Sequence, residues 1–233
     1  MAYLVDYFMV FIISYLIGSI PFSWIITKLK TGKDLRKIGS GNVGGRNVYR
    51  ATKSLWWALI AGLLDVSRTF LAVWIPYFLV YKLNTEVTGL HSGRYILLVA
   101  GVAAAIGHNW PYYLHSHGGR GITVVVGTAV FLNPLVIPIW IGLWLICIII
   151  IGYSSITYIV VTFLTGIVSY FLPLMSWVPI DNLSLCLLYI ILSLIMLSRQ
   201  GDNIRKIRQG EAKKIDLIKV FKKKSKLSEE ILH

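Results

Sequence analysis

A nearly unbroken apolar run from residue 122 to residue 198 constrains the fold more than any other feature of this sequence. The run is 77 residues long and its only charged residue is Asp181. A transmembrane helix needs about 20 apolar residues, so the run holds enough for about four spans. Turn-forming residues interrupt it near Asn133–Pro138, Gly152–Ser155 and Pro173–Asn182. The run therefore predicts four membrane-spanning helices joined by short turns.

Three further apolar segments precede this run, at residues 7–27, 55–81 and 95–114. No Lys or Arg comes before the first of them, so it lacks the basic start of a cleaved signal peptide. We therefore expect it to be a membrane span. The chain is predicted to be an all-α polytopic membrane protein, with a seven-span helix bundle in residues 1–210 and a basic tail in residues 211–233.

The composition excludes most soluble protein classes. Hydrophobic residues make up 56% of the chain and charged residues only 14%, whereas a soluble domain is about 25% charged. This much apolar surface also excludes global disorder. The two cysteines, Cys147 and Cys186, lie within the apolar run, which excludes a secreted disulfide scaffold.

The basic residues are distributed unevenly, and this predicts the orientation. The net charge is +13, which on a soluble protein would suggest a nucleic-acid partner. With seven spans, however, 20 of the 23 Lys and Arg residues fall on one side, in residues 28–54, at Arg120 and after residue 198. Basic loops stay in the cytoplasm. We expect a multi-pass protein of the plasma (inner) membrane, with its N-terminus outside, its C-terminus cytoplasmic and no nucleic-acid partner.

The first candidate site is a glycine-rich segment in the loop 28–54. It contains the pattern G-x-G-x-x-G, but a dinucleotide fold also needs a preceding strand. Glycines let backbone N–H groups approach an anion closely, and arginines add forked donors suited to phosphate. A flexible loop with ordinary cytoplasmic charge is the alternative. The candidate residues are Gly39, Ser40, Gly41, Asn42, Gly44, Gly45, Arg46, Asn47 and Arg50.

The second candidate site surrounds the end of the third apolar segment. Glycines again flank a basic residue, and the N-terminus of the next span faces the same place. Two histidines without cysteine or a nearby carboxylate, His115 and His117, are a weak metal-ligand set, so no metal is expected. A packing histidine is the alternative for His108. The candidate residues are His108, His117, Gly118, Gly119, Arg120 and Gly121.

A third candidate group follows the last span, and the expected topology brings all the groups together. Arg199 and Asn203 lie there, where a simple stop-transfer charge cluster is the alternative. Ser155 lies near a predicted cytoplasmic turn, although hydroxyls in helices often only bond to their own backbone. All these groups lie on the cytoplasmic face of a seven-span protein. They predict one anion-binding cluster where a phosphorylated substrate from the cytosol meets a lipid-like one.

Asp65 and Arg68 share a helix face inside a span, and we expect a structural ion pair.

These motifs resemble those of the bacterial acyl-phosphate:glycerol-3-phosphate acyltransferase family. The first is similar to that family's Gly-Ser-Gly-Asn-x-Gly-Ala-Thr-Asn-Val-x-Arg. The second is similar to Gly-His-x-x-Pro followed by Lys-Gly-Gly-Lys-Gly-Val-Ala-Thr, and the third to Arg-His-x-x-Asn-Ile-x-Arg. The segments Gly18–Phe22, Leu64–Asp65 and Tyr153–Ser155 also have counterparts, so the resemblance runs in order over most of the chain.

The resemblance implies a seven-span enzyme that moves a fatty acyl group from acyl phosphate to the 1-hydroxyl of sn-glycerol 3-phosphate. The products are lysophosphatidic acid and phosphate, in the first step of phospholipid synthesis. It implies no cofactor, a monomer, and acyl phosphate, glycerol 3-phosphate and membrane lipids as partners. The implied catalytic residues are Ser40, Asn47, Arg50, His108, Arg120, Ser155 and Asn203. The other candidates, Arg46, His117 and Arg199 among them, are implied to bind substrate.

We single out five of the chain's departures from the family pattern. Arg46 and Val124 replace threonines, His117 and Arg120 replace lysines, and Gln200 replaces a histidine. These changes leave two alternatives open: a non-catalytic or altered-specificity relative that binds phospholipid, and a small membrane transporter. We expect Arg50, Arg120 and the glycine-loop amides to hold the phosphates, Ser40 and Asn47 to orient the acceptor, and the substrate's own phosphate to act as base.

Overall fold

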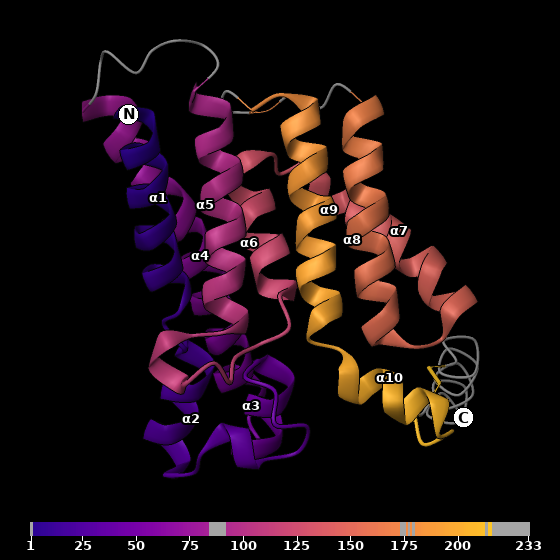
Figure 1. The fold of residues 1–233 in the computed structure, drawn as a ribbon. Coiled ribbons are helices and arrows are strands. Elements are labelled where there is room, and N and C mark those ends of the chain that lie inside the picture. The colour runs from indigo at the N-terminus through magenta and orange to yellow at the C-terminus, as the bar shows by residue number, and fades with distance from the viewer. Residues whose placement is uncertain are drawn as a thin grey trace, which may run out of the picture.

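The computed structural model describes residues 2–83, 92–172, 176, 178, 180–212 and 214–215. Ten α-helices and two short 3-10 turns, Leu35–Lys37 and Tyr112–Leu114, account for its regular structure (Figure 1). The helices are α1 (Ala2–Gly18), α2 (Phe22–Thr31), α3 (Gly45–Thr52), α4 (Leu55–Leu83), α5 (Ser92–Asn109), α6 (Ile122–Leu132), α7 (Val136–Ile151), α8 (Ser154–Phe171), α9 (Asn182–Ser198) and α10 (Gly201–Arg208).

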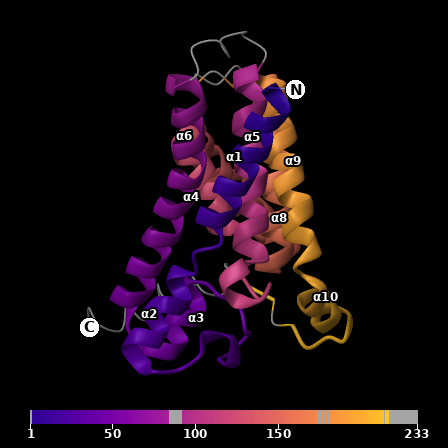
Figure 2. The same ribbon diagram turned by 60° about the vertical axis from the view of Figure 1, so that its left-hand side comes forward.

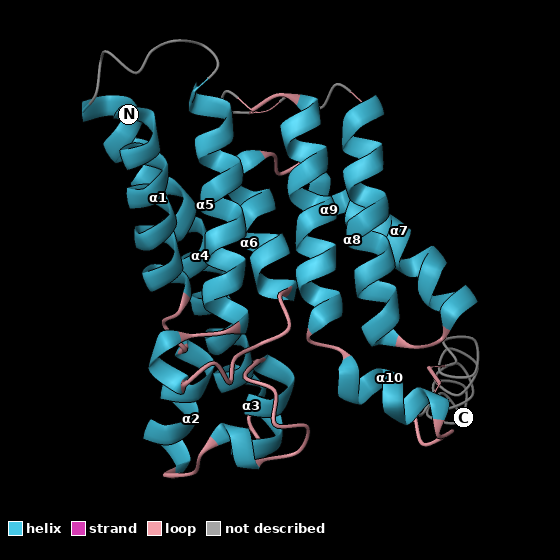
Figure 3. Ribbon diagram, in the orientation of Figure 1, coloured by secondary structure: helices cyan, strands magenta, loops and turns pink. Residues whose placement is uncertain are grey.

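The longer helices stand side by side, and the shorter ones gather at one end. In Figures 1 and 2, α1, α4, α5, α8 and α9 run along the length of the bundle, while α2, α3 and α10 lie at the end opposite to the start of α1. Figure 3 shows no strand in the described residues. The predicted all-α class is therefore confirmed for this part of the chain.

The helices differ in their ability to cross a bilayer. In the described part, Leu4–Thr31, Leu55–Val80 and Ser154–Phe171 are long and apolar enough, and α9 with α10, bent by 63°, makes a possible fourth. Helix α6 has 11 residues, so it is about 17 Å long against a hydrocarbon core of about 30 Å. Seven spans and the orientation of the two ends remain predictions.

Most helix boundaries lie where the sequence places them. Breaks at 133–135 and 152–153 separate α6, α7 and α8, and α9 begins at Asn182. The expected break at Pro173–Asn182 lies partly outside the described residues. Two of the differences lie at prolines: the first apolar segment is interrupted between Gly18 and Phe22, and the third is α-helical only to Asn109. Pro21 and Pro111 explain both, because proline lacks an N–H and disfavours helix in the residue before it.

Two glycines hold the first break of the chain against the end of α5. A Cβ on Gly18 would lie 2.7 Å from the carbonyl oxygen of Ala104, and one on Gly107 would collide with the carbonyl oxygen of Tyr15. Small residues let helix backbones approach this closely in membranes. The close approach of α1 to α5 brings the Ser19–Pro21 break beside His108.

Candidate functional site

A cavity of about 590 Å³ lies among four segments that are far apart in the sequence. The segments are residues 40–50, residues 120–123 at the start of α6, residues 153–158 at the start of α8, and residues 200–215; His108 adds to the lining. Helices α3 and α10 belong to the end of the bundle where the short helices gather (Figure 1). The predicted convergence of three separate motifs is therefore present in the fold.

The glycine-rich segment turns sharply before it enters α3. Gly39 and Gly41 have φ values of 56° and 67°, in the left-handed region that glycine tolerates best. Gly44 caps α3 in an extended conformation. Ser40, Gly44 and Gly45 line the cavity, so the first amides of α3 lie at its wall.

The buried side chain of Asn47 holds this segment in place through hydrogen bonds. Its Nδ2 donates to the carbonyl oxygens of Ile38 at 2.6 Å and Leu35 at 3.2 Å. Its Oδ1 accepts a hydrogen bond from Nη1 of Arg50 at 3.4 Å. The amide of Asn47 therefore holds the loop and the guanidinium of Arg50 in place.

The paired glycines of the second motif pack against His108. A Cβ on Gly118 would collide with the carbonyl oxygen of His108, and a Cβ on Gly119 would collide with its Nε2 atom. The backbone N–H of Gly119 donates to the carbonyl oxygen of His108 at 3.0 Å. These two glycines therefore bring the loop against the end of α5, although neither lines the cavity.

Arg120 and His117, the two basic residues of that loop, are placed differently. Arg120 lines the cavity. Burial lowers the pKa of Arg120, with Arg199 and Arg46 acting in the same direction and Asp202 opposing them; an arginine nevertheless stays protonated in proteins. His117 is exposed, and its Nδ1 donates to the carbonyl oxygen of His115 at 2.7 Å.

The third group contributes through α10 and the residue before it. Asn203 donates through Nδ2 to Oε1 of Gln200, and both side chains line the cavity. Ser155 lines the cavity from the start of α8. Arg199 does not line the cavity; its guanidinium lies 5.7 Å from the ring centre of Trp110.

The structure thus brings together most of the candidates from the sequence and leaves some outside. The cavity is lined by Ser40, Asn42, Gly44, Gly45, Arg46, Asn47, Arg50, His108, Arg120, Gly121, Ser155 and Asn203. Outside its lining lie Gly39, Gly41, His117, Gly118, Gly119 and Arg199. The roles of the lining residues remain predictions.

Several cavity residues were not among the candidates. Lys206 adds a cation and lies three residues after Asn203 on α10, a spacing that places both on one helix face and would have identified it. Gln200, Thr123 and Ser154 add polar groups, and Ile122 and Tyr158 add apolar wall. No sequence pattern singles out Ala212 and Ile215, which reach the cavity because the backbone N–H of Ile215 bonds to the carbonyl oxygen of Gly152 at 2.8 Å.

Two further predictions concern an ion pair inside a helix and a metal site. Asp65 and Arg68 form the expected ion pair, with Oδ1 and Nη1 3.5 Å apart and both side chains buried. Within the described residues, no group of three His, Cys, Asp or Glu side chains is placed to hold a metal ion.

Comparison with known proteins identifies the family. A sequence model described as "Glycerol-3-phosphate acyltransferase" matches residues 8–210. The chain belongs to the glycerol-3-phosphate acyltransferase family. It is an acyltransferase, which argues against the transporter alternative.

Named members of the glycerol-3-phosphate acyltransferase family match nearly the whole chain. The enzyme of Ehrlichia ruminantium (strain Gardel) is 33% identical over 208 residues, which cover 89% of this chain and 96% of the relative. That of Thermosipho melanesiensis is 32% identical over 221 residues, which cover 95% of this chain and 98% of the relative.

Solved structures of a family member share the fold. A crystal structure of PlsY, described as an integral membrane glycerol 3-phosphate acyltransferase in its glycerol 3-phosphate form, has a TM-score of 0.68 and 26% identity. The lysophosphatidic acid form has a TM-score of 0.69 and 25% identity. Each match covers 92% of this chain and 98% of the PlsY chain. With the apolar helices, these matches support an integral membrane protein.

Proposed function

We propose that the cavity transfers a fatty acyl group from acyl phosphate to the 1-hydroxyl of sn-glycerol 3-phosphate. Four side-chain cations line it, Arg46, Arg50, Arg120 and Lys206, and its described lining contains no Asp or Glu. This excess of positive charge carries the proposal. The phosphate groups of glycerol 3-phosphate and acyl phosphate together bring about three to four negative charges, which such a lining would neutralise.

In this reaction the hydroxyl oxygen of glycerol 3-phosphate bonds to the acyl carbonyl carbon. The bond from that carbon to the phosphate oxygen breaks, and phosphate leaves with the electron pair. Arg50, Arg120 and the first amides of α3 hold the phosphates, which fixes the reacting atoms and stabilises the leaving group. Ser40 orients the acceptor. Because the described lining offers no carboxylate, the hydroxyl proton goes to a substrate phosphate.

The wall of the cavity suits a substrate that is part lipid. Ile122 and Tyr158 add apolar surface beside the cations, so a phosphate head would lie among the arginines while its acyl chain leaves toward the bilayer. We place the cavity on the cytoplasmic face of the inner membrane, as the distribution of basic residues suggests, in a monomeric multi-pass protein whose basic tail begins after residue 210.

The decisive test uses purified protein in lipid nanodiscs with palmitoyl phosphate and sn-glycerol 3-phosphate. Phosphate and lysophosphatidic acid should form in equal amounts. Phosphate without the lipid product would refute the proposed acceptor. Neither product from folded protein would refute the reaction.

Arginine and lysine variants test the location of the site. We expect Arg50→Ala and Lys206→Ala each to lower kcat/KM at least about tenfold, which is about 1.4 kcal/mol of transition-state stabilisation. Arg208→Ala is the matched control, because Arg208 is an exposed cation of α10 outside the cavity lining. Equal effects of Lys206→Ala and Arg208→Ala would mean that general surface charge, not this cavity, binds the substrates.

A further inference from the structure

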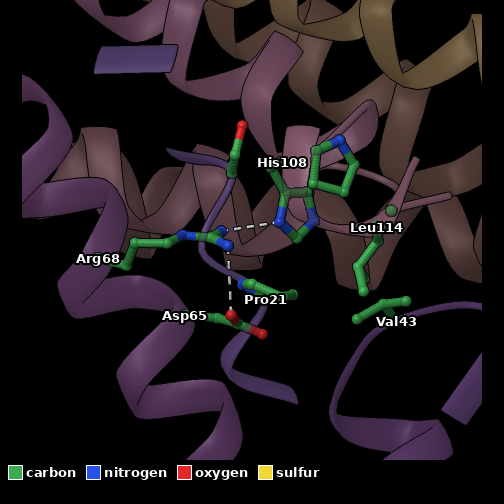
Figure 4. Close-up of a pocket in the computed structure, with 10 residues that line it drawn as sticks. Pro21, Val43, Asp65, Arg68, His108 and Leu114 are labelled. Carbon is green, nitrogen blue, oxygen red and sulfur yellow. Dashed lines mark hydrogen bonds and ion pairs between the residues drawn. The ribbon is translucent and has the colours of Figure 1, made fainter. Parts of the chain in front are cut away.

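A chain of buried polar groups connects α4 to His108 without taking part in the cation lining of the cavity. The Oγ of Ser23 donates to Oδ2 of Asp65 at 2.6 Å, and Asp65 pairs with Arg68. Arg68 Nη1 also donates to the carbonyl oxygen of Ile20 at 2.6 Å, in the break between α1 and α2. Its Nη2 lies 2.7 Å from Nδ1 of His108. Figure 4 shows Arg68 between Asp65 and His108.

The contact between Arg68 and His108 determines which nitrogen of the imidazole carries the proton. A guanidinium has only donors and does not lose its proton in proteins, so Nδ1 of His108 is the acceptor. A neutral imidazole with an acceptor at Nδ1 carries its proton on Nε2. An imidazolium would place a second N–H, and a second positive charge, against Arg68. The geometry therefore selects one neutral tautomer of His108.

The Nε2 atom, on the other edge of the ring, has no hydrogen-bond partner among the described residues. His108 lines the cavity and is 6% exposed. No hydrogen bond connects its Nε2 to any of the described residues, although Gly119 packs against that edge. The Nε2–H therefore has no hydrogen-bond partner among the described residues, and it belongs to a side chain that lines the cavity.

We propose that Arg68 is a positioning residue for acyl transfer: it holds His108 as the Nε2–H tautomer, whose N–H donates to a substrate oxygen. The inference rests on the proposed function. Arg68 acts only through His108, and His108 acts as a fixed donor and not as a base. A preorganised donor aimed at developing negative charge needs no reorganisation during the reaction. Among the described residues, Arg68 on α4 and Arg199 after α9 act electrostatically on His108, and Asp65 pairs with Arg68. The cations Arg46, Arg50, Arg120 and Lys206 line the same cavity as His108.

The first test measures the tautomer of His108 in the absence of substrate. Protein labelled with 15N-histidine in nanodiscs should show His108 protonated at Nε2 and bare at Nδ1 throughout pH 6 to 8, with its signal assigned by loss in His108→Gln. Arg68→Lys retains a cationic donor and should retain this pattern. The double variant Asp65→Asn with Arg68→Met, which leaves no unpaired buried carboxylate, should give a mixture that varies with pH. An Nδ1–H tautomer or an imidazolium at pH 7 in the wild type would overturn the assignment.

The second test reads activity. We expect Arg68→Lys to stay within about threefold of wild-type kcat/KM and the double variant to lose at least about tenfold. Ser23→Ala is the matched control, since it removes one bond of the same network but leaves Arg68 on His108. Equal losses in Ser23→Ala and the double variant would reduce Arg68 to a structural role.

A third comparison keeps the inference testable if the double variant does not fold. The amide of glutamine reaches the position of Nε2, whereas that of asparagine reaches only Nδ1. His108→Gln should therefore retain at least about tenfold more activity than His108→Asn; equal activities would refute the donor role. If the wild type makes no lysophosphatidic acid, the proposed reaction fails, while the tautomer measurement still decides the link between Arg68 and His108.

Discussion

Replacing Asn47 with alanine tests whether this residue contacts substrate or holds the site together. The change removes the donor to the carbonyl oxygens of Leu35 and Ile38 and the acceptor for Arg50. The backbone N–H groups of Ile38 and Gly41 still donate to the carbonyl oxygens of Leu35 and Ile38, so neither carbonyl is left without a partner. The change removes two hydrogen bonds to these carbonyls at about 0.5–1.5 kcal/mol each, or about 1–3 kcal/mol together. For a chain of this size that lowers the apparent Tm by about 2–12 °C.

The assay is thermal unfolding in detergent, together with kcat/KM for acyl transfer. We expect Asn47→Ala to lower both, because the loop that carries Arg50 loses its inner support. Asn42→Ala is the control for Tm, since Asn42 lines the same cavity but no side-chain hydrogen bond is seen to tie it to the described residues. If Asn47→Ala raised only the KM for glycerol 3-phosphate and left Tm within about 1 °C of wild type, Asn47 would be a substrate ligand and this reasoning would be wrong.

Two further predictions concern a glycine and a carboxylate. Gly119→Ala should lower kcat/KM at least about tenfold, because its Cβ would displace the imidazole that Arg68 holds. Gly201 has open space around it, so Gly201→Ala should leave kcat/KM unchanged. Equal effects of the two substitutions would disprove the steric reason. The hydrogen bond from Arg36 holds the pKa of Asp34 below its ordinary value, so Asp34 adds stability above the unfolded value of about 3.9 that is lost as the pH falls through its lower folded value. Wild-type Tm should therefore exceed that of Asp34→Asn at neutral pH and converge on it in acid; a constant difference across the titration would contradict the assignment.

Local sequence patterns predicted much of the helical framework and most of the cavity lining. The apolar run and its turn residues place α6, α7, α8 and α9, because helix length and proline or glycine breaks are local properties. Arg50, Arg120 and Asn203 stand out by residue type and spacing. The break before Pro21 and the early end of α5 before Pro111 were also readable from proline chemistry, but were not predicted.

Other assignments depend on which surfaces meet. Gly118, Gly119 and His117 belong to one glycine-rich motif, yet the glycines pack on His108, and the histidine is exposed and lies outside the cavity lining. Lys206 reaches the lining through the bend between α9 and α10. The spacing of Lys206 from Asn203 places both on one face of α10, but the contact of that face with the cavity, like the placement of His117, does not follow from spacing along the chain.

The sequence by itself determined an apolar, helical, membrane-embedded chain with basic, glycine-rich motifs suited to phosphate, because burial and anion binding depend on residue type. Only the tertiary structure decided how Arg68 is used. Residues 68 and 108 are 40 positions apart, and their hydrogen bond exists because α1, α4 and α5 pack closely around the break at Pro21. That contact, and with it the protonated edge of His108, is a property of packing between helices that no single helix specifies.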